Sequence, residues 1–154
     1  MKYLIVIFSF LYFSNNLNES LVDSTFKPNV DQISLKEQFY NKLEVKINLP
    51  MMLNKYIDKK ALERTEVPNS IWQDIKNNID YTYFKFQVLN NIDYYYSEVE
   101  LQSLINSNVN NPKIPITKIA FRKELGHMIE DFIEVKFLDK VNSTLLQNGF
   151  TKIN

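Results

Sequence analysis

Residues 70–105 constrain the fold most, because their apolar side chains return once per helical turn. These apolar residues recur at steps of three, four or seven: Ile71, Ile75, Ile79, Phe86, Leu89 and Ile92. Polar side chains such as Gln73 and Asn77 occupy the opposite side, whereas a strand would alternate polar and apolar at every second residue. The pattern therefore predicts amphipathic helices that bury one face.

Helix starts are marked by a serine followed three residues later by Glu or Gln. In this capping box each side chain satisfies a backbone N–H that the first helical turn leaves unpaired. The motif occurs at Ser34 with Glu37, at Ser70 with Gln73, and at Ser97 with Glu100, where Tyr96 and Leu101 also occupy the positions of a hydrophobic staple. The short segment before Ser97 is then a tight corner between two antiparallel helices.

The same period continues on both sides of this stretch. Upstream, a helix should end before Pro50, which would begin the next helix. Downstream, we expect Thr117 to cap a last helix that ends at Gly149, with Gly126 inside it marking a close helix contact or a kink. The predicted fold is all-α, a single-domain antiparallel bundle of about five helices over residues 33–154.

Residues 1–20 read as an export signal, followed by a polar linker over residues 21–32. Lys2 precedes an apolar run from Tyr3 to Phe13, which is shorter than the roughly 20 residues that a helix needs to cross a bilayer. The alternative is an uncleaved membrane anchor, because a cut after Ser14 would place Tyr12 where a small residue is preferred. The expected location is periplasmic or secreted.

The composition excludes several classes of function. The 18 basic and 18 acidic residues cancel, so no basic surface for nucleic acid is expected. The chain has no cysteine, which excludes disulfides and thiolate chemistry, and its two glycines do not form a phosphate-binding loop. We expect no cofactor.

Two groups of residues are candidate sites. Glu124, His127 and Asp131 match part of a carboxylate–histidine metal site, although di-iron bundles need two Glu-x-x-His motifs and His127 is the only histidine. The alternative interpretation is a solvated acidic helix face. Tyr94, Tyr95 and Tyr96 form a candidate binding surface, and the alternative is that these rings pack the helix corner.

The run from Tyr96 to Ile105, YSEVELQSLI, resembles the bacterial domain-of-unknown-function 2059 family over about residues 70–125. Members have an aromatic residue, Ser or Thr, two variable residues, then Glu-Leu and an apolar pair. The family usually continues with an aromatic pair and Ser-Pro-x-Gly, which this chain lacks at residues 107–115. The resemblance implies a small exported helical protein and no defined activity.

The sequence thus favours an exported helical protein that binds an unknown protein or a small ligand and is not an enzyme. The alternatives are a metal-binding or hydrolytic protein built on Glu124, His127 and Asp131, or a helical protein anchored in the membrane by its amino-terminal segment.

Overall fold

The computed structural model describes residues 33–107, 114 and 116–153. Its helices are α2 (Leu35–Lys42), α3 (Glu44–Glu63), α4 (Asn69–Asn77), α5 (Thr82–Tyr95), α6 (Glu98–Asn106), α7 (Ile119–Phe132) and α8 (Leu138–Gln147), with a 3-10 turn η1 (Ile116–Lys118) and a π-helical segment η2 (Ile133–Phe137). No strand occurs in this part of the chain, so the all-α prediction is confirmed. The predicted signal and linker lie outside the described residues.

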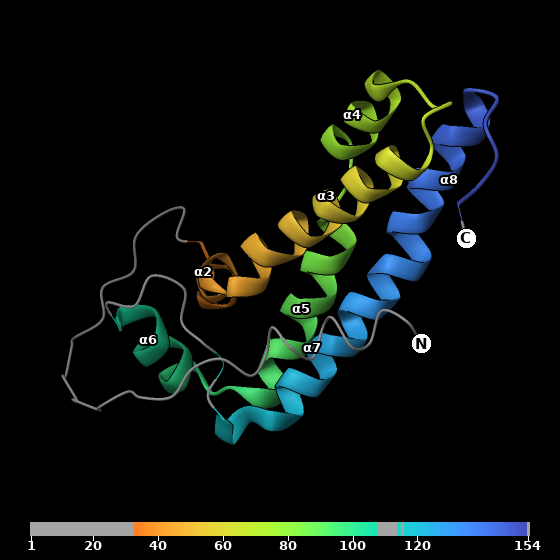
Figure 1. Cartoon of the computed structure of the whole chain (residues 1–154). Helices are drawn as coiled ribbons and strands as arrows, with labels where there is room; N and C mark the ends of the chain where they lie inside the picture. The colour runs from red at the N-terminus through yellow and green to blue at the C-terminus, as the bar shows by residue number, and fades with distance from the viewer. Residues whose placement is uncertain (1–32, 108–113, 115, 154) are drawn as a thin grey trace.

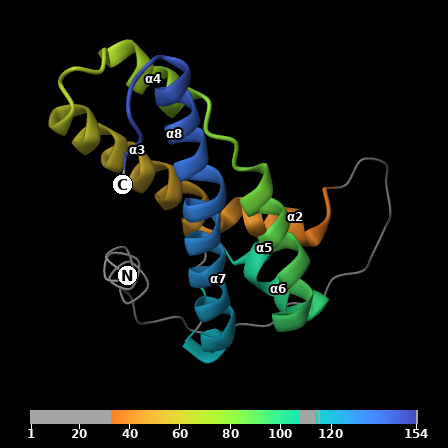
Figure 2. The ribbon, with the colours of Figure 1, turned by 90° about the vertical axis from the view of Figure 1, so that its right-hand side faces the viewer.

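A continuous rod made of α7, η2 and α8 runs along the molecule and connects two groups of helices (Figures 1 and 2). In the α5–α7 group, α5 packs on α7, and α2 packs on both α5 and α6. In the α4–α8 group, α4 packs on α3 and α8. A single cluster of buried apolar side chains extends through both groups.

The buried face of the central stretch differs in part from the prediction. Ile75 and Ile92 are fully buried as expected, but Phe86 is 62% exposed. The predicted helix over residues 70–92 is interrupted at residues 78–81, and the carboxylate of Asp80 then accepts the N–H of Thr82 at 2.9 Å where α5 begins. This interruption changes the helical phase of the apolar residues that follow it. Phe84 and Val88 therefore face the core, and Phe86 does not.

Pro50 was predicted to begin a helix, and this prediction is wrong. Pro50 lies inside α3, and the break between α2 and α3 is at Leu43, whose backbone is extended while its side chain is buried. A proline inside a helix removes one hydrogen bond, here the one to the carbonyl of Lys46. The burial of Leu49 and Leu53 in the same helix offsets that loss.

Of the three predicted capping boxes, the structure confirms one. Ser97 and Glu100 form the complete reciprocal box. Ser34 accepts the N–H of Glu37, whose carboxylate instead pairs with Lys85. At the other two predicted starts the caps are Pro68 and Lys118, so neither Ser70 nor Thr117 is a cap.

The last helix ends as predicted at Gly149, which has a φ of 81°. The N–H of Gly149 donates to the carbonyl of Leu146, and that of Phe150 donates to the carbonyl of Leu145. These two bonds define a Schellman motif, in which a residue with positive φ ends the helix and satisfies its last carbonyls.

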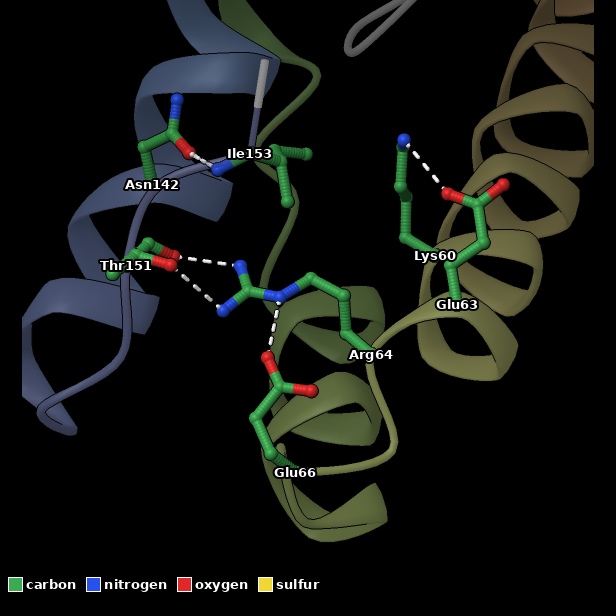
Figure 3. A network of polar contacts seen from close by, with 7 residues as sticks. All are labelled: Lys60, Glu63, Arg64, Glu66, Asn142, Thr151 and Ile153. Carbon is green, nitrogen blue, oxygen red and sulfur yellow. Dashed lines mark hydrogen bonds and ion pairs between the residues drawn. The ribbon is translucent and has the colours of Figure 1, made fainter.

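The carboxyl-terminal tail is held against the turn between α3 and α4 (Figure 3). The guanidinium of Arg64 donates to the carbonyl oxygen of Thr151 at 2.7 Å and to its hydroxyl at 3.1 Å, and also to the carboxylate of Glu66 at 2.8 Å. The side-chain oxygen of Asn142 accepts the N–H of Ile153 at 2.8 Å, and Ile153 is buried. The tail therefore forms part of the α4–α8 group.

Gly126 marks neither a close contact nor a kink, because no atom lies within 4 Å of the position that a Cβ would occupy. The irregular segment of the rod is η2, seven residues further along. We therefore expect Gly126→Ala to raise the free energy of unfolding by about 1 kcal/mol, through the higher helix propensity of alanine. Gly149→Ala should lower it by about 1 kcal/mol, because alanine is strained at positive φ. Urea denaturation measures both, and a loss of stability in the first variant would contradict this prediction.

Candidate functional site

The candidate site is a cavity of about 410 Å³ between the end of α2, the start of α3 and the start of α5. It is lined by Tyr40, Asn41, Val45, Lys46, Leu49, Pro50, Tyr81, Thr82, Phe84 and Lys85. Pockets for small molecules have volumes of about 300–1,000 Å³ and often lie between the helices of a bundle. Both the size and the place of this cavity fit that class.

Two local features of the sequence produce the cavity. The extended backbone at Leu43 turns the chain, so that α3 leaves α2 and runs toward the α4–α8 group. The interruption at residues 78–81 places the first turn of α5 opposite that corner. The walls are therefore helix ends rather than one continuous packed face.

The inner wall of the cavity is apolar. Leu49 and Phe84 are 3% and 1% exposed, and the half-buried ring of Tyr81 stacks on Phe132 with centroids 5.5 Å apart. Burial raises the pKa of Tyr40, and it raises that of Tyr81 to about 12. Like any tyrosine of ordinary pKa, both are protonated at neutral pH, and within the described part of the chain neither hydroxyl has a hydrogen-bond partner.

The charged groups in the cavity wall are two lysines, with no acidic side chain among the lining residues. Lys85 forms an ion pair with Glu37 of α2. The ammonium of Lys46 donates to the side-chain oxygen of Asn41 at 2.6 Å, which is a neutral partner. The wall thus combines aromatic rings, hydroxyl groups and positive charge.

The structure places Tyr94, Tyr95 and Tyr96 in three different environments. Tyr94 is 83% exposed, whereas Tyr96 is 5% exposed. The ring of Tyr96 lies 5.0 Å from that of Phe39 and 5.3 Å from that of Phe121, and the ring of Tyr95 also contacts Phe121. Two of the three rings therefore pack the corner between α5 and α6, and none of the three lines the cavity.

The residues of the predicted metal site are not brought together. The carboxylate of Asp131 accepts from the hydroxyl of Tyr83 at 2.7 Å and from the amide of Gln87 at 2.8 Å, and it raises the pKa of Tyr83. His127, with a side chain 60% exposed, has its Nδ1 3.5 Å from a carboxylate oxygen of Glu130. No group of three His, Asp or Glu side chains that could hold a metal ion, including Glu124, occurs among the described residues.

Sequence reasoning missed the pocket residues Tyr40, Lys46, Tyr81 and Lys85. No motif connects residues 40–50 with residues 81–85, because the packing of α2 against α5 brings them together. The one available signal was the run of aromatic side chains that begins at Tyr81.

In the residues that the structure covers, no helix has both the length and the apolar character that crossing a membrane requires. No protein-family model, no curated protein and no solved structure matches this chain. The resemblance to the domain-of-unknown-function 2059 family stays a prediction.

Proposed function

We propose that this protein is an exported, non-enzymatic binding protein that takes a small ligand into the pocket between α2, α3 and α5. The observation that carries the proposal is the cavity of about 410 Å³, whose lining combines buried apolar side chains with tyrosine hydroxyls and two lysines. Export is supported by the charged and apolar start of the sequence.

The chemistry of the lining residues supports binding rather than catalysis. None of them carries a carboxylate, an imidazole or a thiol, the groups that most often transfer protons or attack substrates. His127, the only histidine, lies on α7 and does not line the cavity. The two phenols are protonated at neutral pH and can act as hydrogen-bond donors.

A substitution that fills the cavity tests the proposal. The neutral dye phenylnaphthylamine, which fluoresces in apolar surroundings, should bind the full protein saturably. Val45→Trp should weaken this binding by at least about tenfold, equivalent to about 1.4 kcal/mol, because an indole takes up part of the cavity. Thr82→Trp, at an exposed lining position on α5, should act in the same direction without a change in the core.

The matched control is Val99→Trp, at a position on α6 that is 79% exposed and does not line the cavity. It should bind the dye as the unmodified protein does. Thermal unfolding of each variant verifies that it is folded. Saturable binding that is unaffected by both cavity substitutions, or no saturable binding at all, would contradict the proposed function.

A further inference from the structure

Of the two lysines in the cavity wall, one has no acidic partner among the described residues. Glu37 neutralises Lys85, whereas Lys46 donates only to the neutral side chain of Asn41. Among the described residues Lys46 forms no ion pair. A ligand that brings a negative charge to Lys46 would give this ammonium group an ionic partner.

The other polar groups of the wall suit the same kind of ligand. Tyr40 and Tyr81 bring hydroxyl groups that are without partners in the described residues, whereas the hydroxyl of Thr82 already bonds to the carboxylate of Asp80. Hydrogen bonds to a charged acceptor are stronger than those to a neutral one, so these donors favour an anionic group over a neutral one. The apolar side chains of Leu49 and Phe84 leave the rest of the cavity to a hydrocarbon or aromatic body.

We propose that the ligand is a small soluble anionic amphiphile, with a carboxylate, sulfonate or phosphate group at Lys46 and an apolar body against Tyr40, Leu49 and Phe84. This inference rests on the proposed function and specifies the ligand class of the same pocket. Lys85 is a second cation that becomes available to the ligand only when its pair with Glu37 opens. Glu37 therefore limits the preference for anions.

Two dyes with the same aromatic rings separate charge from shape. Anilinonaphthalene sulfonate carries a sulfonate group that phenylnaphthylamine lacks. We expect the full protein to bind the sulfonate more tightly than the neutral dye, and we expect Lys46→Gln to lower the affinity for the sulfonate by about fivefold. The affinity for the neutral dye should stay within about twofold, because Lys46→Gln removes a charge and leaves the apolar wall intact.

Two further variants complete the test. Glu37→Gln should raise the affinity for the sulfonate by about threefold, because it frees Lys85. Lys55→Gln removes an exposed lysine of the same helix α3 that does not line the cavity, and it should leave both affinities unchanged. The sulfonate affinity should also fall as salt rises, since an exposed charge pair is screened.

The outcomes separate the two proposals. Equal binding of both dyes, unchanged by Lys46→Gln and abolished by Val45→Trp, would overturn the anion preference and leave the pocket function standing. Binding of neither dye would overturn both. Vesicles of phosphatidylglycerol provide an anionic lipid surface. If they bound the protein and the soluble sulfonate did not displace it, the charge of Lys46 would serve membrane binding. That result would overturn the proposal.

Discussion

Replacing Phe132 with alanine is expected to lower the free energy of unfolding by about 3–5 kcal/mol. Phe132 is 0% exposed at the end of α7, with ring centroids 5.5 Å from Tyr81 and 5.9 Å from Phe84. The substitution removes these contacts and leaves a cavity that side chains on two packed helices can fill only in part. Urea denaturation followed by circular dichroism measures the loss.

The matched control is Phe86→Ala on α5. Phe86 is 62% exposed, so its removal should change the free energy of unfolding by less than about 0.5 kcal/mol. Equal effects of the two substitutions would contradict the assignment of Phe132 to the core. Because Tyr81 both stacks on Phe132 and lines the cavity, Phe132→Ala should also weaken dye binding, while Phe86→Ala should not.

This variant also tests whether the two groups of helices unfold together. Phe132 lies in the α5–α7 group, whereas Trp72, the only tryptophan, is buried in the α4–α8 group. The rod of α7, η2 and α8 and a single buried cluster connect the groups, so we expect one cooperative transition. The transition observed by tryptophan fluorescence should then coincide with that observed by circular dichroism.

The features that were predicted correctly are those encoded within a few residues. The box at Ser97 and Glu100 and the glycine at 149 each satisfy backbone groups of their own helix end, so a short motif specifies them. The all-α class follows from a period that many residues share. None of these predictions required knowledge of what packs against the helix.

The errors arise where tertiary packing outweighs local preference. Leu43 is apolar and resembles a helix residue, yet it is the residue at which α2 ends, because its buried side chain is accommodated in an extended backbone. Pro50 resembles a helix start, yet α3 accommodates it. The break before Thr82 had a local signal in Asp80, a residue type that favours helix starts, and the apolar spacing across it concealed that signal.

The pocket between α2, α3 and α5 was not predictable from the sequence pattern. The candidate residues of each group lie close together along the chain, and the structure gives the members of each group different surroundings. His127 and Asp131 are four residues apart on one face of α7, but Tyr83 and Gln87 of α5 hold the Asp131 carboxylate while the His127 side chain is exposed. Tyr94 is exposed, and Tyr96 is buried in the core. The pocket joins side chains about forty residues apart, from Tyr40 to Tyr81, through the packing of α2 on α5.

The α4–α8 group should depend on Trp72 as strongly as the other group depends on Phe132. Trp72 is 1% exposed on α4, which packs between α3 and α8, so Trp72→Ala is expected to cost about 3–5 kcal/mol. The indole Nε1 is buried and has no hydrogen-bond partner among the described residues. Trp72→Phe removes this unsatisfied donor while keeping most of the buried ring, so its cost should be at least about 2 kcal/mol smaller.

Circular dichroism follows both Trp72 variants, since neither retains the fluorophore. Trp72→Phe keeps most of the apolar contact area of the ring. If it lowered the free energy of unfolding as much as Trp72→Ala does, the indole N–H would have to stabilise the fold through a hydrogen-bond partner. A small cost for both variants would instead mean that α4 adds little to the core. In that case the rod and the α5–α7 group would hold the fold without it, and the coincidence of transitions expected for Phe132→Ala would also fail.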